Sequence, residues 1–426
     1  MEIEKVFAKY NDDIERLEYK NFQPITNKQY FNQENQKIVF KIDAEDDFII
    51  TNNIQYNISG DYKAESGTND EKKNIMLIDN FVPHLFSKIE IKKNGVIIDE
   101  IEDPGIVSTV RKYAYYNGDK GESQVSGQYS LFTGGGNFSA VGKLNYLGLG
   151  FCSDIDIPIY RAGLEITFTR NHNNNVLYRF DKEITDPPTL GPEGKSIIIN
   201  TRRIKKSGTG SVEIKNFYIR VPIIQYDNTE KIKLINDITN IPYPLQFKQW
   251  QCIEHRNISG NTLQLNITDL YRNIDNPIWA FIVFQSSRNN NQEKDNSIFD
   301  HSDVKNIWLE IGGKRYPEEN YEIDFEEDNF GEIYDAFKLY QKYYSKNDVY
   351  SLDANDFKNK APIYSFNLTF QPSKVSSFKN NIIANIQFSK RISNPSANDG
   401  TICYIILLSN ILFNYDPIKN KVIKDI

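Results

Sequence analysis

The residue types that most often carry catalysis are scarce in this chain. Its 426 residues include four histidines and three cysteines: His84, His172, His255, His301, Cys152, Cys252 and Cys403. No two histidines have the spacing of zinc ligands on a helix or hairpin, and no cysteine pair lies near them, so we expect no metal site. Cys252 and His255 could form a nucleophile–base pair, but residues three apart on a strand point to opposite faces of the sheet. Each histidine is interpreted as a surface or structural residue.

One glycine-containing stretch has a superficial likeness to a phosphate-binding loop. It reads Gly191-Pro-Glu-Gly194-Lys195-Ser196, but Thr189 occupies the position where the motif needs its first glycine. The following Ile197-Ile-Ile199 is typical of a strand, whereas phosphate binding uses the N–H groups of a following helix. Gly134–Gly136 also lacks a strand–turn–helix context, and we interpret it as a loop.

Acidic and aromatic clusters offer two further chemistries. Asp324–Asp328 could bind calcium or supply the carboxylate pair of a glycosidase, but adjacent acids at a strand end usually form a solvated rim. The pairs Tyr115-Tyr116 and Tyr343-Tyr344 could stack on sugars, and aromatic residues also fill sandwich cores and subunit contacts. No catalytic, cofactor-binding or metal-binding residue is assigned, and we expect a protein that is not an enzyme.

The charge argues against direct nucleic-acid binding. Against 57 Asp+Glu stand 50 Lys+Arg, which gives a net charge of −7 and a pI near 5.4. The first 36 residues carry five basic and seven acidic groups, so no basic arm is present to neutralise phosphates. The dense basic run Arg202–Lys206 is interpreted as a solvated hairpin end, with a local contact to a polyanion as the alternative. We expect no sequence-specific nucleic-acid binding.

Nothing in the sequence predicts a membrane span or a secretory leader. The longest apolar runs, Ile278–Phe284 and Ile402–Leu408, are about seven residues long, far below the roughly 20 that a spanning helix needs. An odd number of distant cysteines suits free thiols in a reducing compartment.

Most of the chain has the two-residue alternation of half-buried strands. The clearest case is Lys88–Lys92, which runs into Asn94-Gly95, a strong hairpin signal, and returns as Val96–Asp99. Helices are expected only at Pro104–Tyr116 and Asp328–Tyr344. Further strands are expected at Lys37–Asp43, Phe48–Ile58, Ala162–Thr169, Ser196–Asn200, Val212–Val221, Ala280–Gln285, Ile307–Ile311, Ile363–Phe370, Ile382–Phe388 and Thr401–Leu408.

The two halves of the chain have a faint internal similarity. An alternating strand ends in a tight glycine turn at Ile89 to Gly95 and again at Ile307 to Gly313, an offset of 218 residues. The proline-containing segment Gln225–Pro244 separates the halves. We therefore predict an N-terminal arm (1–36), an N-terminal sandwich (37–228), a linker (229–244) and a C-terminal sandwich (245–426). We expect a neighbouring copy to order the arm.

Several stretches, taken together and in order, resemble the double jelly-roll major capsid proteins of Polinton (Maverick) elements and adintoviruses. The resemblance covers roughly residues 38–426. In the first half it rests on Leu85–Ile89, Lys93–Asp99, Gly105–Thr109, Leu147–Phe151 and Leu164–Arg170. In the second half it rests on Phe247–Trp250, Pro277–Gln285, Phe299–His301, Arg315–Pro317, Asn414–Pro417 and Val422–Ile426. Lys248 departs from the family, which usually has arginine there, and the loop Asn171–Asn175 is unusually uncharged.

The resemblance implies a mainly β fold of two tandem eight-stranded antiparallel jelly rolls with short helices in the connecting loops. It implies a major capsid protein that assembles as pseudo-hexameric homotrimers into an icosahedral shell around double-stranded DNA. The implied partners are other copies of the chain and a penton or minor capsid protein. The implied location is the virion, after synthesis in the host cytoplasm and assembly in the cytoplasm or nucleus. A tandem-sandwich carbohydrate-binding protein remains the alternative.

Overall fold

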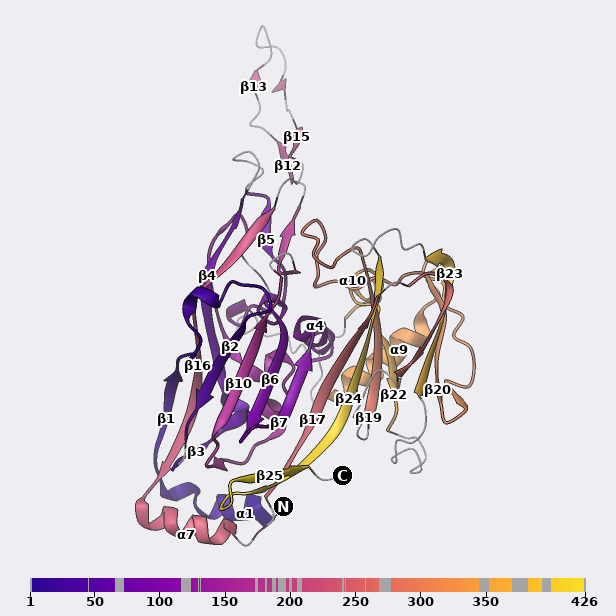
Figure 1. The fold of residues 1–426 in the computed structure, drawn as a ribbon. Coiled ribbons are helices and arrows are strands. Elements are labelled where there is room, and N and C mark those ends of the chain that lie inside the picture. The colour runs from indigo at the N-terminus through magenta and orange to yellow at the C-terminus, as the bar shows by residue number, and fades with distance from the viewer. Residues whose placement is uncertain are drawn as a thin grey trace.

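Alternating apolar residues build two β-sandwiches that stand side by side in the computed structural model (Figure 1). The structure describes residues 2–44, 46–65, 73–115, 124–128, 130, 132–172, 175–180, 182–185, 189–190, 197–198, 201–204, 209–239, 241, 243–256, 258–267, 277–344, 352–369, 382–392 and 400–424. The ladders between their strands are all antiparallel, so the expectation of a mainly β, antiparallel fold is confirmed.

The first sandwich has two facing sheets. One follows the order β1 (Ile14–Phe22), β16 (Gly210–Tyr226), β4 (Gln55–Ala64) and β8 (Gly136–Lys143), with the short β3 (Phe48–Ile49) and β9 (Ile159–Tyr160) continuing from β16. The other follows the order β2 (Lys37–Ile42), β10 (Leu164–Arg170), β6 (Phe86–Lys93) and β7 (Val96–Glu102).

The second sandwich repeats this arrangement. One sheet follows the order β17 (Tyr243–His255), β24 (Thr401–Asp416), β19 (Pro277–Ser286) and β22 (Tyr364–Asn367), and β25 (Lys421–Lys424) also pairs with β24. The other follows the order β18 (Gly260–Asn266), β23 (Ile382–Ile392), β20 (Val304–Ile311) and β21 (Lys314–Tyr316). The strands have the same chain order and the same neighbours in both sandwiches, so the two halves share one topology.

Short helices decorate the loops, as expected. The two predicted helices are present as α4 (Pro104–Tyr115) and α9 (Gly331–Tyr344). Helix α9 begins after Asp328 because that residue has a left-handed backbone (φ 56°) and Asp324 pairs with Asn329 in a turn. Other helices within the described residues are α1 (Glu2–Lys9), α3 (Phe81–His84), α6 (Phe151–Asp154), α7 (Asn228–Thr239) and α10 (Ala354–Lys360).

Each sandwich encloses an aromatic core. In the first, Phe217 lies against Phe40 and Phe168, with ring centroids 4.9 and 5.0 Å apart. In the second, Phe284 of β19 meets Phe388 of β23 edge-on at 5.8 Å. Aromatic pairs of this kind add to the burial energy that holds the two sheets of a sandwich together.

Helix α9 covers the outer face of the sheet that contains β19. Its Tyr340 lies 4.5 Å from Phe281 and 5.4 Å from Trp279.

The first 36 residues pack on their own chain. Strand β1 pairs with β16 from Ile14↔Tyr226 to Phe22↔Ile219. Farther along, the N–H of Ile25 donates to Val39 O (2.8 Å) and the hydroxyl of Thr26 accepts from the N–H of Val39 (3.0 Å), which covers the edge of β2. The order of these residues therefore does not require a neighbouring copy, as we had expected it to.

A narrow two-stranded extension stands out from one end of the first sandwich. It contains the pairs β12 (Lys182–Thr185) with β15 (Thr201–Ile204) and β13 (Thr189–Leu190) with β14 (Ile197–Ile198). Both chain ends lie at the opposite end of the molecule, near α1, α7 and β25 (Figure 1). The two ends of the protein therefore differ in structure.

Candidate functional site

The two sandwiches meet along a seam between two edge strands. Among the described strands, β7 forms a ladder with β6 alone and β17 forms a ladder with β24 alone, so each has one open edge. These open edges lie next to each other (Figure 1). Because an open edge is a site for unwanted strand pairing, each sandwich protects the other at this seam.

A buried carboxyl group joins the two edges. Asp99 of β7 is 1% exposed; its Oδ2 accepts from the N–H of Phe151 (2.9 Å) and its Oδ1 from Nε2 of Gln249 on β17 (3.4 Å). Burial raises the pKa of Asp99 from 3.8 to about 7, although both hydrogen bonds act to lower it. The carboxyl group thus carries a desolvation cost that only its hydrogen-bond partners reduce.

Helix α6 of the first sandwich presses directly on β17. The N–H of Lys248 donates to Oδ2 of Asp154 (2.8 Å), and the ring of Phe151 meets that of Phe247 edge-on at 5.8 Å. Gly150 lies so close to the backbone carbonyl of Lys248 that a methyl group at this position would overlap it. The glycine is therefore what allows the two sandwiches to approach.

A buried lysine anchors the end of the seam near the chain termini. Nζ of Lys93 donates to the carbonyls of Arg161 (2.5 Å) and Ala162 (2.6 Å) and lies 4.5 Å from the ring of Tyr415 in the second sandwich. The hydroxyl of Tyr415 donates to Tyr160 O in the first sandwich (2.7 Å). Burial lowers the pKa of Lys93 from 10.5 to about 7.

Polar contacts also close the seam elsewhere along its length. Gln341 of α9 donates through Nε2 to Tyr113 O of α4 (2.7 Å). The side chain of Gln292 makes a reciprocal pair with the backbone of Gly210, accepting from its N–H (2.7 Å) and donating to its carbonyl (2.8 Å). These directional bonds fix the relative orientation of the sandwiches more strictly than apolar contact alone does.

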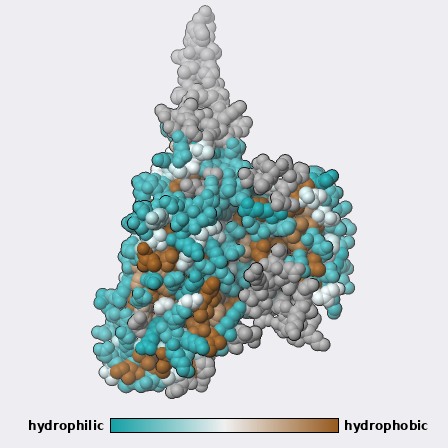
Figure 2. Space-filling view, viewed as in Figure 1, coloured by the Kyte–Doolittle hydropathy of each residue, from teal (hydrophilic) through white to brown (hydrophobic). Residues whose placement is uncertain are grey.

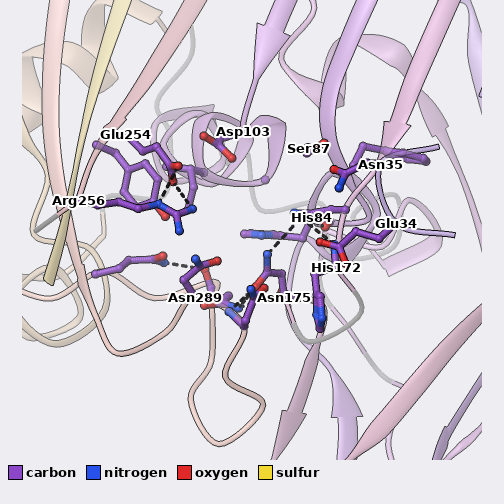
Figure 3. A pocket seen from close by; sticks show the side chains of 18 residues that line it. Glu34, Asn35, His84, Ser87, Asp103, His172, Asn175, Glu254, Arg256 and Asn289 are labelled. Carbon is purple, nitrogen blue, oxygen red and sulfur yellow. Dashed lines mark hydrogen bonds and ion pairs between the residues drawn. The ribbon is translucent and has the colours of Figure 1, made fainter. Parts of the chain in front are cut away.

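A polar cavity of about 250 Å³ lies within the seam (Figure 3). Its walls come from both sandwiches and include His84, His172 and Asp103 on one side and Glu254 and Arg256 on the other. Nε of Arg256 donates to Oε1 of Glu254 (2.8 Å). Burial and the nearby Lys112 lower the pKa of His84 to about 3, so its imidazole is neutral at physiological pH. Burial and the acidic neighbours Glu254 and Glu102 raise the pKa of Asp103 to about 7.

The remaining candidate residues of the sequence are dispersed. His301 stacks on Phe325 at 4.6 Å, and His255 ends β17. All three cysteines are buried, and burial raises the pKa of each thiol, so none is a thiolate nucleophile. Within the described part of the chain, no three histidine, cysteine or acidic side chains come together as metal ligands.

Several sequence motifs have simple structural roles or lie outside the described residues. Oδ1 of Asp324 accepts from the N–H of Glu326 (2.9 Å), so the acidic run is a surface turn. Tyr344 packs against Trp250 (5.8 Å), whereas Tyr343 is 43% exposed. Gly191–Ser196, Tyr116 and Lys205–Lys206 lie outside the described residues; Arg202–Ile204 belong to β15.

Residues 199–412, half of the chain, match the family described as "Double jelly roll-like domain". The chain belongs to this family. The prediction of a double jelly roll is therefore confirmed. No curated protein matches the sequence.

Solved structures with the same double jelly-roll fold come from viral capsids. The Sputnik virophage structure solved by cryo-EM matches with a TM-score of 0.57 and 12% identity, covering 97% of this chain and 89% of that one. The quasi-atomic model of the PBCV-1 virus capsid matches with a TM-score of 0.55 and 11% identity, covering 94% of both chains. The mavirus major capsid protein matches with a TM-score of 0.51 and 10% identity, covering 96% of this chain and 90% of that one. At these identities the matches show a shared fold.

The described helices of this double jelly roll include none that is long and apolar enough to cross a membrane.

The sequence analysis assigned no structural role to the seam residues. Asp99 and Lys93 stand beside the Asn94-Gly95 turn, where charged residues are normally exposed, and Gln249 is an ordinary strand residue. The one indication is that Asp99 directly follows the apolar Ile98. Adjacent strand residues point to opposite faces, and both side chains are buried, so both faces of β7 are covered. Strand β17, which covers β7, begins more than a hundred residues later in the sequence.

We predict that the Asp99→Asn variant loses less stability than the wild type as the pH rises. Between pH 3.8 and about 7 the folded chain holds a proton on Asp99 that the unfolded chain has released, so the free energy of unfolding falls across this window. Asparagine does not titrate, and a flipped Gln249 amide can still pair with it. Thermal unfolding at pH 5 and pH 8 should show a smaller decrease in Tm for the variant than for the wild type. Equal decreases would contradict the buried position of this carboxyl group.

We also predict that Gly150→Ala destabilises the protein, because its methyl group forces α6 away from β17. Overpacking of this kind costs about 1–3 kcal/mol, measured as a lower Tm. Gly331→Ala is the matched control, since a methyl group there meets open space. If both variants unfold like the wild type, α6 and β17 are not in close contact.

Proposed function

We propose that this chain is a major capsid protein that assembles as a homotrimer, each trimer presenting six jelly rolls in an approximately hexagonal outline. The observation that most strongly supports this proposal is that the similarity to capsid structures spans both sandwiches and covers 94–97% of this chain. The matching proteins thus share the arrangement of both sandwiches, and not only the fold of one of them.

The physics of the seam supports this role. A shell is built by repeating one set of contacts, so its repeating unit, here called the tile, must keep a constant shape. The buried hydrogen bonds of Asp99, Tyr415 and Gln292 hold the two jelly rolls in one orientation. The extension at one end and the chain termini at the other (Figure 1) make the two ends different, as the inner and outer faces of a shell must be.

The finer assignment rests on the sequence resemblance. We propose a shell of icosahedral symmetry around double-stranded DNA, in a virus or integrated element of the Polinton–adintovirus type, with a penton or minor capsid protein as a further partner. The net charge of −7 favours a shell whose DNA is compacted by other proteins. The chain would be made in the host cytoplasm, assemble there or in the nucleus, and act without enzymatic activity.

The described surface does not favour the carbohydrate-binding alternative. Such proteins bind sugars with clustered exposed aromatic rings. The exposed tyrosines among the described residues, Tyr19, Tyr30 and Tyr343, lie on three separate elements.

We predict that the purified protein has a mass near three times 49.4 kDa by light scattering, and that electron microscopy shows hexagonal particles. The reason is that one chain supplies two of the six jelly rolls of a tile. A protein that stays monomeric at high concentration would contradict the proposed function.

A further inference from the structure

The seam inside the chain uses one edge from each sandwich and leaves the equivalent edges open. In the shared topology β1 of the first sandwich corresponds to β17 of the second, and β7 corresponds to β21. The seam joins β7 to β17. Among the described strands, β1 forms a ladder with β16 alone and β21 with β20 alone, so each keeps an open edge.

The correspondence of β1 and β17 is visible residue by residue. Leu17-Glu-Tyr-Lys-Asn-Phe22 pairs with Ile224 to Ile219 of β16, and Leu245-Gln-Phe-Lys-Gln-Trp250 pairs with Phe413 to Leu408 of β24. These two partner strands end in Tyr226-Asp227 and Tyr415-Asp416. The two hexapeptides thus occupy the same place in their sheets and have similar sequences.

The equivalent side chains differ in burial. On β17, Leu245 is 0% and Phe247 1% exposed. On β1, Leu17 is 57% and Tyr19 39% exposed. The face that carries Leu245 and Phe247 meets the first sandwich, as the Phe151–Phe247 contact shows. β1 thus presents the apolar face of a seam strand without the sandwich that would cover it.

Figure 2 shows apolar patches on the lower part of this side of the molecule, where Figure 1 places α7 and the lower part of β1. Single exposed apolar side chains are common on protein surfaces. A leucine and a tyrosine two residues apart on an open edge strand are, in contrast, a recognised risk for association.

The geometry points to a second copy of this chain as the occupant of the β1 edge. We propose that β1 of one copy packs against the β20–β21 hairpin of the next, repeating the β17–β7 seam between copies. The inference rests on the proposed function, whose trimer it supplies with an interface. A head-to-tail contact of this kind covers both the β1 edge and the β21 edge of every copy when the copies close into a ring.

The apolar face of β1 is separate from its charged face. Leu17 and Tyr19 alternate with Glu18, so the carboxylate points to the opposite side of the strand. There Glu18 pairs with Arg16 (2.6 Å) and Lys20 (3.7 Å) of its own strand. The contact between copies is therefore made by the apolar face, as in the seam.

The first test is Leu17→Glu, measured as the trimer–monomer equilibrium by sedimentation. A buried unpaired carboxylate should weaken the trimer by at least about tenfold, while an unchanged circular dichroism spectrum and Tm would show that the monomer still folds. Leu339→Glu, at a leucine 60% exposed on α9 of the second sandwich, is the matched control and should leave the trimer intact. If Leu17→Glu forms trimers as well as the wild type does, the inference is wrong although the proposed function stands. If the wild type forms no trimer, both fail.

The second test compares the two faces of β1. Tyr19→Glu, on the face of Leu17, should weaken the trimer by at least about tenfold, whereas Glu18→Gln, on the opposite face, should leave the trimer intact. Equal effects of the two variants would overturn the proposed contact.

Discussion

The arrangement of this protein depends on burying polar groups between two sandwiches. A carboxyl group and an ammonium group removed from water are costly unless their hydrogen bonds are completed. Gln249 of the other sandwich donates one of the hydrogen bonds that Asp99 accepts, and Lys93 lies against the ring of Tyr415. Sliding one sandwich along the other would remove the Gln249 hydrogen bond from Asp99 and the Tyr415 ring from Lys93. The seam therefore selects one orientation.

The same seam explains how the molecule manages its sheet edges. β7 and β17 protect each other, and residues 25–26 cover the edge of β2. Among the strands that the structure describes, β1 and β21 each keep an open edge, and they are the counterparts of β17 and β7, which form the seam. Folding and assembly can thus use a single type of contact, once within the chain and once between copies.

The sequence predicts the regular part of this fold well because alternation is a local signal. Most predicted strands are present, and the similarity at an offset of 218 residues is real, since β6–β7 and β20–β21 occupy the same places in their sheets. β8 was missed because it begins in the glycine run that we interpreted as a loop. β1 was missed because its alternation is limited to Leu17 and Tyr19 between charged residues, a run too short to indicate a strand. The segment 229–244, predicted as a linker, contains most of α7 and the start of β17; the domain boundaries remain a prediction. The seam could not be predicted, because partners such as Asp99 and Gln249 are far apart in the sequence and no local pattern links them.

The fixed orientation of the two sandwiches is tested most directly by a distance measurement between them. Spin labels at Lys63→Cys on β4 and Leu339→Cys on α9 occupy exposed positions, whereas the native cysteines are buried. Pulsed electron paramagnetic resonance on the two-label protein, diluted with unlabelled chains, should give one narrow distance distribution, the same in the monomer and in the trimer. A broad or bimodal distribution in the monomer would show that the sandwiches move independently, and would contradict this account.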